Sequence, residues 1–141
     1  MLPIVAGATF VAALMYLTTV CTAQAVSNQK LLALSKTNHI LAIMHPVTLK
    51  IMARIPVGVD THEVVASLDE RTVYLCIYGG DSLHEINVID LVTQNHLLNI
   101  DTRPLFGPHD ITFVNGKAWF TAEGSKSVSR YETVTGKLYW I

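Results

Sequence analysis

The chain has 141 residues, with 10 Lys and Arg against 11 Asp and Glu, and a hydrophobic fraction of 50%. This length allows one ordinary domain and leaves little room for a second. The net charge of −1 means that the chain has no excess of positive charge to attract nucleic acid or an anionic membrane surface. Because only 15% of the residues are charged and half are apolar, global disorder is excluded.

The N-terminal residues have the features of an export segment. No charged residue precedes Lys30, and residues 4–20 form an almost unbroken apolar run. This run is shorter than the roughly 20 apolar residues that a membrane-spanning helix needs. Small residues follow it, with Ala23 and Ala25 at the −3 and −1 positions of a cleavage site. These features predict a signal peptide at residues 1–25 and a secreted or periplasmic protein.

Other interpretations of this segment stay open. Residues 1–3 carry no Lys or Arg, whereas signal peptides begin with a positively charged region. An uncleaved segment would anchor the protein in a membrane, and a translation start assigned too far upstream would remove the segment altogether. Lipidation of Cys21 is less favoured, because Val20 stands where a small residue normally precedes such a cysteine.

Cleavage after Ala25 leaves Cys76 as the one cysteine of the mature chain, so no intrachain disulfide is expected. Cys76 lies in a run with a strong β pattern, residues 73–78, and we predict that it is a small buried hydrophobe rather than a reactive thiol. The two cysteines and the scattered histidines have no spacing typical of a structural zinc site.

Residues beyond position 30 show no helical periodicity. Short runs rich in Val, Ile, Leu, Tyr and Thr are separated by Asn, Asp, Gly, Pro and Ser, which is typical of strands and tight turns. Asn115-Gly116, between two apolar runs, favours a type I′ hairpin. The pattern predicts strands at residues 31–35, 39–44, 50–55, 62–67, 73–78, 85–90, 96–101, 109–114, 117–122, 127–132 and 136–140.

The strands belong to an internal repeat with a period of roughly 42 to 47 residues. A unit of this length with four short antiparallel strands is the size of one β-propeller blade, which buries its two faces only against neighbouring blades. We therefore predict an all-β fold, a partial β-propeller of about two and a half four-stranded blades over residues 26–141. The landmarks that recur in the same order are Leu31–Leu34, Val73–Cys76 and Ala118–Thr121, then Thr48, Thr93 and Thr135, and finally His62-Glu63 and His109-Asp110.

The repeat resembles the YVTN-type, YncE-like group of β-propeller proteins over essentially all of residues 30–141. Residues 118–124 also resemble, more weakly, the blade motif of streptogramin lyase-like and gluconolactonase-like propellers. The resemblance implies a secreted or periplasmic propeller, usually of seven blades, and it says little about function because these residues build the scaffold. The segments that carry the main resemblance are Asn38–Ile43, Ile55–Gly58, His62–Ser67, Arg71–Leu75, Ile86–Asp90 and Pro108–Ile111.

The length of the chain conflicts with a seven-bladed ring, which needs about 300 residues at this repeat length. We expect either that the chain is a fragment of a longer propeller or that several copies associate to close a ring. An open wedge of blades would expose strand edges and apolar faces, which favours self-association.

The repeated pairs His62-Glu63 and His109-Asp110 are the best candidates for a functional site. In a propeller each pair would begin an innermost strand at the mouth of the central channel, where imidazoles and carboxylates could bind a metal or transfer protons. The competing interpretation is structural, because catalytic residues are usually unique whereas scaffold residues recur. In that case each pair orders the loop between two blades by hydrogen bonding.

Glu123 is a further candidate for the channel mouth. Gluconolactonase-like propellers hold a divalent cation with acidic and Asn side chains, and Glu123, Asp110 and Asn38 are residues of these types. Four other histidines have no acidic neighbour at a matching position of the repeat, so we expect them at turns or on the surface: His39, His45, His84 and His96.

The favoured function is a non-catalytic, exported propeller that binds a protein or a small ligand and needs no cofactor. The alternative is a metal-dependent lactonase or lyase at the channel mouth, and a module that acts by assembly is a third hypothesis. No GxSxG elbow, phosphate-binding loop, dinucleotide fingerprint, HExxH or CxxCH sequence occurs. The identity of the partner or ligand is left open, and nucleic acid is not expected.

Overall fold

The computed structural model describes residues 29–80 and 82–141, and within these ranges the chain is built of eleven β-strands. None of the described residues forms a helix that could cross a membrane. The predicted signal peptide at residues 1–25 and Cys21 lie outside the described residues. The strands are β1 (Leu31–Ser35), β2 (Ile40–Met44), β3 (Ile51–Pro56), β4 (Thr61–Ala66), β5 (Thr72–Ile77), β6 (Glu85–Asp90), β7 (Asn95–Asp101), β8 (Pro108–Val114), β9 (Lys117–Ala122), β10 (Ser127–Glu132) and β11 (Lys137–Trp140).

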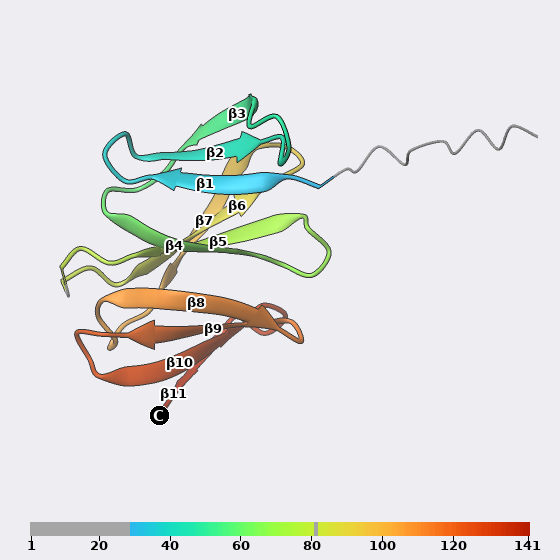
Figure 1. The fold of residues 1–141 in the computed structure, drawn as a ribbon. Coiled ribbons are helices and arrows are strands. Elements are labelled where there is room, and N and C mark those ends of the chain that lie inside the picture. Colours follow the sequence, from blue (N-terminus) through green and yellow to red (C-terminus); the bar gives the residue numbers. More distant parts are fainter. Residues whose placement is uncertain (1–28, 81) are drawn as a thin grey trace, which may run out of the picture.

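The strands form three antiparallel sheets stacked side by side (Figure 1). The first sheet has the order β1-β2-β3, the second β4-β5-β6-β7 and the third β8-β9-β10-β11. Each strand pairs with the strand next to it in sequence, so every sheet is an up-and-down meander, as in a propeller blade. The described chain is therefore a partial β-propeller of two four-stranded blades and one three-stranded sheet, which confirms the predicted fold class.

Each strand predicted from the sequence is present, with ends that differ by no more than one residue. The hairpin between β8 and β9 has the predicted geometry, because Asn115 and Gly116 have φ angles of 49° and 73° as a type I′ turn requires. His39 lies in the turn before β2, with a φ of 53°, which agrees with its expected position at a turn, so β2 begins one residue later than the predicted strand 39–44.

Two apolar clusters fill the spaces between the sheets. Leu41, Val73 and Leu75 belong to the cluster between the first and second sheets, and Cys76 and Phe120 belong to the one between the second and third. The second sheet is thus buried on both faces, which is why β5 reads as a continuous apolar run rather than an alternating one. Cys76 is fully buried, as predicted for a small core residue.

Candidate functional site

The two repeated His-acid pairs lie at equivalent irregularities of two neighbouring strands. β4 is the first strand of the second sheet, β8 is the first strand of the third, and the two strands lie against each other (Figure 1). His62 and Glu63 together face a single residue of β5, and His109 and Asp110 together face a single residue of β9. Each pair therefore forms a β-bulge, a feature that redirects side chains and is frequent beside functional sites.

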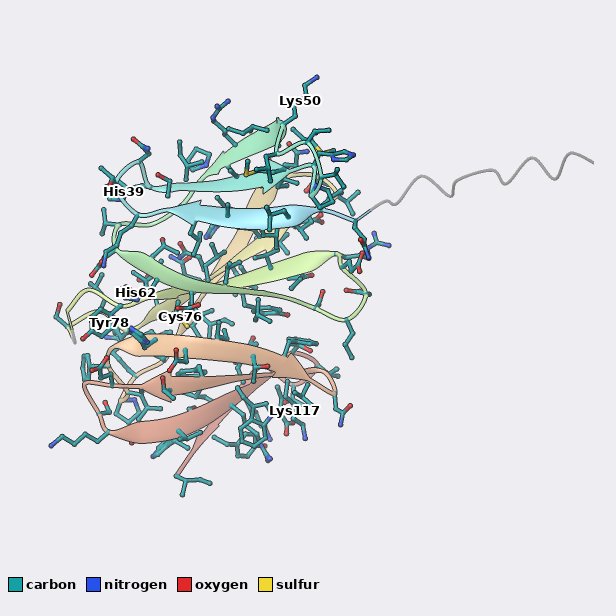
Figure 2. The ribbon with its side chains drawn as sticks, viewed as in Figure 1. His39, Lys50, His62, Cys76, Tyr78 and Lys117 are labelled. Carbon is teal, nitrogen blue, oxygen red and sulfur yellow. The ribbon has the colours of Figure 1, made fainter. Side chains whose placement is uncertain are left out.

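The bulges bring His62 and His109 into contact across the junction of the two sheets. Their ring centroids are 4.4 Å apart, and the ring of Tyr78 lies 5.1 Å from His62 and 5.0 Å from His109. Figure 2 shows His62 and Tyr78 close together at this junction. These distances are within the range of aromatic ring contacts. We call His62, Tyr78 and His109 the ring cluster.

Asp110 brings a carboxylate to the ring cluster. Its Oδ1 is 3.4 Å from Nδ1 of His109, and the Asp110 side chain is 73% exposed against 26% for His109. In a regular strand adjacent side chains point to opposite faces, so the bulge is what allows this contact. The Asp110 backbone N–H donates to Oγ1 of Thr121 at 3.1 Å, which fixes the bulge against β9. The pair can act as an imidazole oriented by a carboxylate.

Glu123 lies beside the same pair. A hollow of about 530 Å³ opens beside β8, β9 and β10 and is lined by three of the five predicted site residues, together with Lys126. The Glu123 backbone N–H donates to the Gly107 carbonyl at 2.8 Å, just before β8 begins. The full lining consists of His109, Asp110, Thr121, Ala122, Glu123, Lys126, Ser127 and Val128.

Glu63 and Asn38 are not part of this hollow. Glu63 is exposed beside the buried Cys76. Burial raises the pKa of the Cys76 thiol, and the negative charges of Glu63 and Asp110 raise it further. Asn38 donates to Oγ of Ser35 within its own hairpin at 2.9 Å, so the structure does not bring it to Glu123. Cys76 accordingly has the environment of an inert core thiol.

A metal centre is not assembled by these side chains. Among residues 29–80 and 82–141, no group of three or more His, Cys, Asp or Glu side chains is placed to hold a metal ion. The ring cluster offers two imidazoles and a phenol, and Asp110 approaches one of the imidazoles from its exposed side. The arrangement is suited to stacking on a planar ligand and to hydrogen bonding through the imidazole and phenol groups.

Tyr78 belongs to the site although its local sequence pattern did not indicate this. The Tyr78 backbone N–H donates to the Asp60 carbonyl at 3.2 Å, and the Glu123 backbone N–H donates in the same way to the Gly107 carbonyl. Both acceptor residues, Asp60 and Gly107, have positive φ angles. Tyr78 and Glu123 therefore hold the same position in successive blades. Extending the repeat alignment beyond Cys76 would have paired the two residues and marked Tyr78 as a rim residue.

Comparison with protein-family models finds no match, and no curated protein matches the sequence. Solved structures of similar fold include Kuenenia stuttgartiensis hydrazine synthase, with a TM-score of 0.66, 16% identity and 78% of this chain covered. The dihydro-heme d1 dehydrogenase NirN, solved in complex with DHE, has a TM-score of 0.61, 14% identity and 77% of this chain covered. The present chain spans 31% of the hydrazine synthase chain and 22% of the NirN chain. Both are β-propeller proteins, and at this identity the likeness shows the fold alone.

Proposed function

We propose that this chain is an exported propeller of the YVTN type that binds a small ligand at the ring cluster without converting it. The observation that carries the proposal is the contact between His62, Tyr78 and His109, three rings from two blades that are gathered where β4 meets β8. The three rings are not members of the neighbouring apolar cluster, so the packing of that core does not account for their contact.

The proposed ligand is a planar, unsaturated small molecule. Imidazole and phenol rings stack on such ligands, and the hollow beside His109, of about 530 Å³, has room for one. NirN acts on dihydro-heme d1, so one protein of similar fold accommodates a heme-type molecule. At 14% identity that comparison suggests which probes to use and does not identify the ligand of this chain.

The proposal is tested with two planar probes, hemin and metal-free protoporphyrin IX, titrated into the full chain and followed by absorbance. Stacking predicts that both probes bind. Loss of one stacked ring costs about 1 kcal/mol, so His109→Ala and Tyr78→Leu are each expected to weaken binding about fivefold.

His39→Asn is the matched control for these variants. It removes an exposed imidazole from a different hairpin, and Asn tolerates the positive φ of that position. The control is expected to bind both probes as the parent does. If His109→Ala and Tyr78→Leu also bind like the parent, or if the parent binds neither probe, the ring cluster is not a binding site for planar ligands.

Export is a separate part of the proposal and rests on the apolar segment at residues 4–20 and on Ala23 and Ala25. Expression of the full chain in a bacterial host, followed by N-terminal sequencing of the periplasmic product, is expected to give a mature chain that begins at Val26. Recovery of the intact chain in the membrane fraction would instead support the uncleaved anchor.

The metal-dependent lactonase or lyase predicted as the alternative depends on a cation held near His109. Among the described residues, no three His, Cys, Asp or Glu side chains are gathered to hold such a cation, so this alternative has less support from the geometry than ligand binding at the ring cluster. Elemental analysis of the purified chain decides the matter, because that enzyme needs bound Ca²⁺, Mg²⁺ or Zn²⁺ and its activity would be lost in His109→Ala.

A further inference from the structure

A second cavity lies between the first and second sheets and shares no lining residue with the hollow beside His109. Its volume is about 430 Å³, and the segment that links β3 to β4 forms one wall. Apolar side chains make up most of the lining, and four polar side chains stand together at one side. The lining residues are Pro56, Val57, Gly58, Val59, Ile77, Leu83, Glu85, Asn87, His96 and Asn99.

A β-bulge in β7 creates the polar side of this cavity. Val88 of β6 pairs with Leu98 and Ile89 pairs with His96, so Leu97 is an extra residue on β7. Residues three apart on a regular strand point to opposite faces, and one extra residue restores them to the same face. His96 and Asn99 therefore both face the cavity, and Nε2 of His96 lies 2.7 Å from Oδ1 of Asn99.

The polar side chains form one continuous chain of hydrogen bonds. The Gly58 N–H donates to Oδ1 of Asn87 at 3.1 Å, and Nδ2 of Asn87 donates to Oδ1 of Asn99 at 2.7 Å. Nδ2 of Asn99 then donates to Oε2 of Glu85 at 3.0 Å. Asn87, which is 5% exposed, lies at the buried end of this series of hydrogen bonds, and the Glu85 carboxylate lies at the other end.

Close packing holds this network in place. A Cβ atom at Gly58 would lie 3.0 Å from Oδ1 of Asn87 and 3.1 Å from Cδ1 of Ile77, so the absence of a side chain allows the linker to approach β5 and β6. The Gly58 carbonyl also accepts from Oγ1 of Thr61 at 2.7 Å. The orientation of Glu85 is therefore set before any ligand arrives, which reduces the entropy cost of binding.

The charge of the cavity is unbalanced. Among the described residues that line the cavity, Glu85 is the one acidic residue, and neither Lys nor Arg is present. Oε2 of Glu85 is occupied by Asn99, and Oε1 has no hydrogen-bond partner among the residues that the structure describes. Val57, Ile77 and Leu83 supply an apolar wall within the same cavity. A free, oriented carboxylate oxygen beside an apolar wall favours a cation that is attached to an apolar group.

We propose that this cavity binds an organic cation, a primary ammonium group carried on an apolar body, with Glu85 as its anionic partner. His96 and Asn99 are positioning residues, because they act on the cation through the carboxylate that they help to orient. This site is separate from the ring cluster, so its test can fail or succeed independently of the proposed function.

The experiment is isothermal titration of the full chain with 2-phenylethylammonium, compared with the neutral 2-phenylethanol. The parent is expected to bind the ammonium at least tenfold more tightly than the alcohol, because a charge-assisted hydrogen bond is stronger than a neutral one. Glu85→Gln is expected to weaken ammonium binding at least tenfold and to leave alcohol binding unchanged. The Gln side chain keeps an oxygen that accepts from Asn99, so this variant removes the charge and preserves the network.

Glu70→Gln is the matched control, because Glu70 is an exposed acid in the turn between β4 and β5 and does not line the cavity. It is expected to bind the ammonium as the parent does. Equal binding of the ammonium and the alcohol by the parent, no binding of the ammonium, or an unchanged affinity in Glu85→Gln would each overturn the proposal.

Discussion

The imidazole rings of His62 and His109 are 4.4 Å apart, although the two residues belong to different sheets and are 47 positions apart in the sequence. The contact depends on two equivalent bulges, one in β4 and one in β8, that turn the two histidines toward the junction of the blades. The repeat therefore does more than duplicate a scaffold residue, because adjacent copies of it meet and form a single cluster.

A double-mutant cycle measures this contact. His62→Ala and His109→Ala are each expected to lower the free energy of unfolding by about 1 kcal/mol, and the double variant by less than the sum, with a coupling energy of about 0.5 to 1 kcal/mol. Urea unfolding at pH 8 gives the four values that the cycle needs. Additive effects, with a coupling energy near zero, would show that the two rings do not stabilise each other.

Cys76 is expected to be unreactive in the folded chain. It is fully buried, and burial together with the nearby carboxylates raises the pKa of its thiol, so little thiolate forms at pH 8. In a Cys21→Ser background, Ellman's reagent should modify Cys76 only as the protein unfolds, with a rate that rises with urea concentration. Rapid modification in buffer alone would contradict the burial of this residue.

The hairpin between β8 and β9 depends on the backbone of Gly116. Its φ is +73°, and a Cβ atom there would meet nothing within 4 Å, so the cost of a side chain comes from the backbone conformation alone. Gly116→Ala is expected to lower stability by about 1 kcal/mol. The control is Gly124→Ala, at a glycine without a positive φ, which should change stability little. Equal melting temperatures for the two variants would count against this explanation.

Asp101 should make stability depend on pH in the acidic range. The Arg103 guanidinium, which donates to its carboxylate, lowers the pKa of Asp101 from 3.8 to about 2. Because the pKa is lower in the folded state, the ionised group stabilises the fold above pH 4, and this contribution is lost as the pH falls toward 2.

The Asp101→Asn variant is therefore expected to melt below the parent at pH 5 and at the same temperature as the parent near pH 2. Both carboxylate and guanidinium are exposed, so the shift at pH 5 should be small and should decrease in 1 M salt. A difference in melting temperature that does not change between pH 5 and pH 2 would rule out the ion pair as its source.

The sequence by itself determined the strands, the turns and the period of the repeat. These features are local: alternation, β-branched residues and turn residues such as Asn115-Gly116 act within a few positions. Burial of Cys76 was also predictable, because it lies in a strand that is apolar at successive positions. The His-acid pairs were recognised as candidates from repetition, although repetition did not show that His62 and His109 touch.

Only the tertiary structure decided which side chains meet. Tyr78 joins the ring cluster because the loop after β5 is held beside β8, a contact between residues distant in the sequence. His96 is exposed, as expected, but only the structure shows that it shares a face with Asn99, because the bulge at Leu97 shifts the alternation of β7 by one residue. A bulge depends on how two strands pair, and contacts between blades depend on how the sheets pack. The local sequence pattern therefore predicts neither of them.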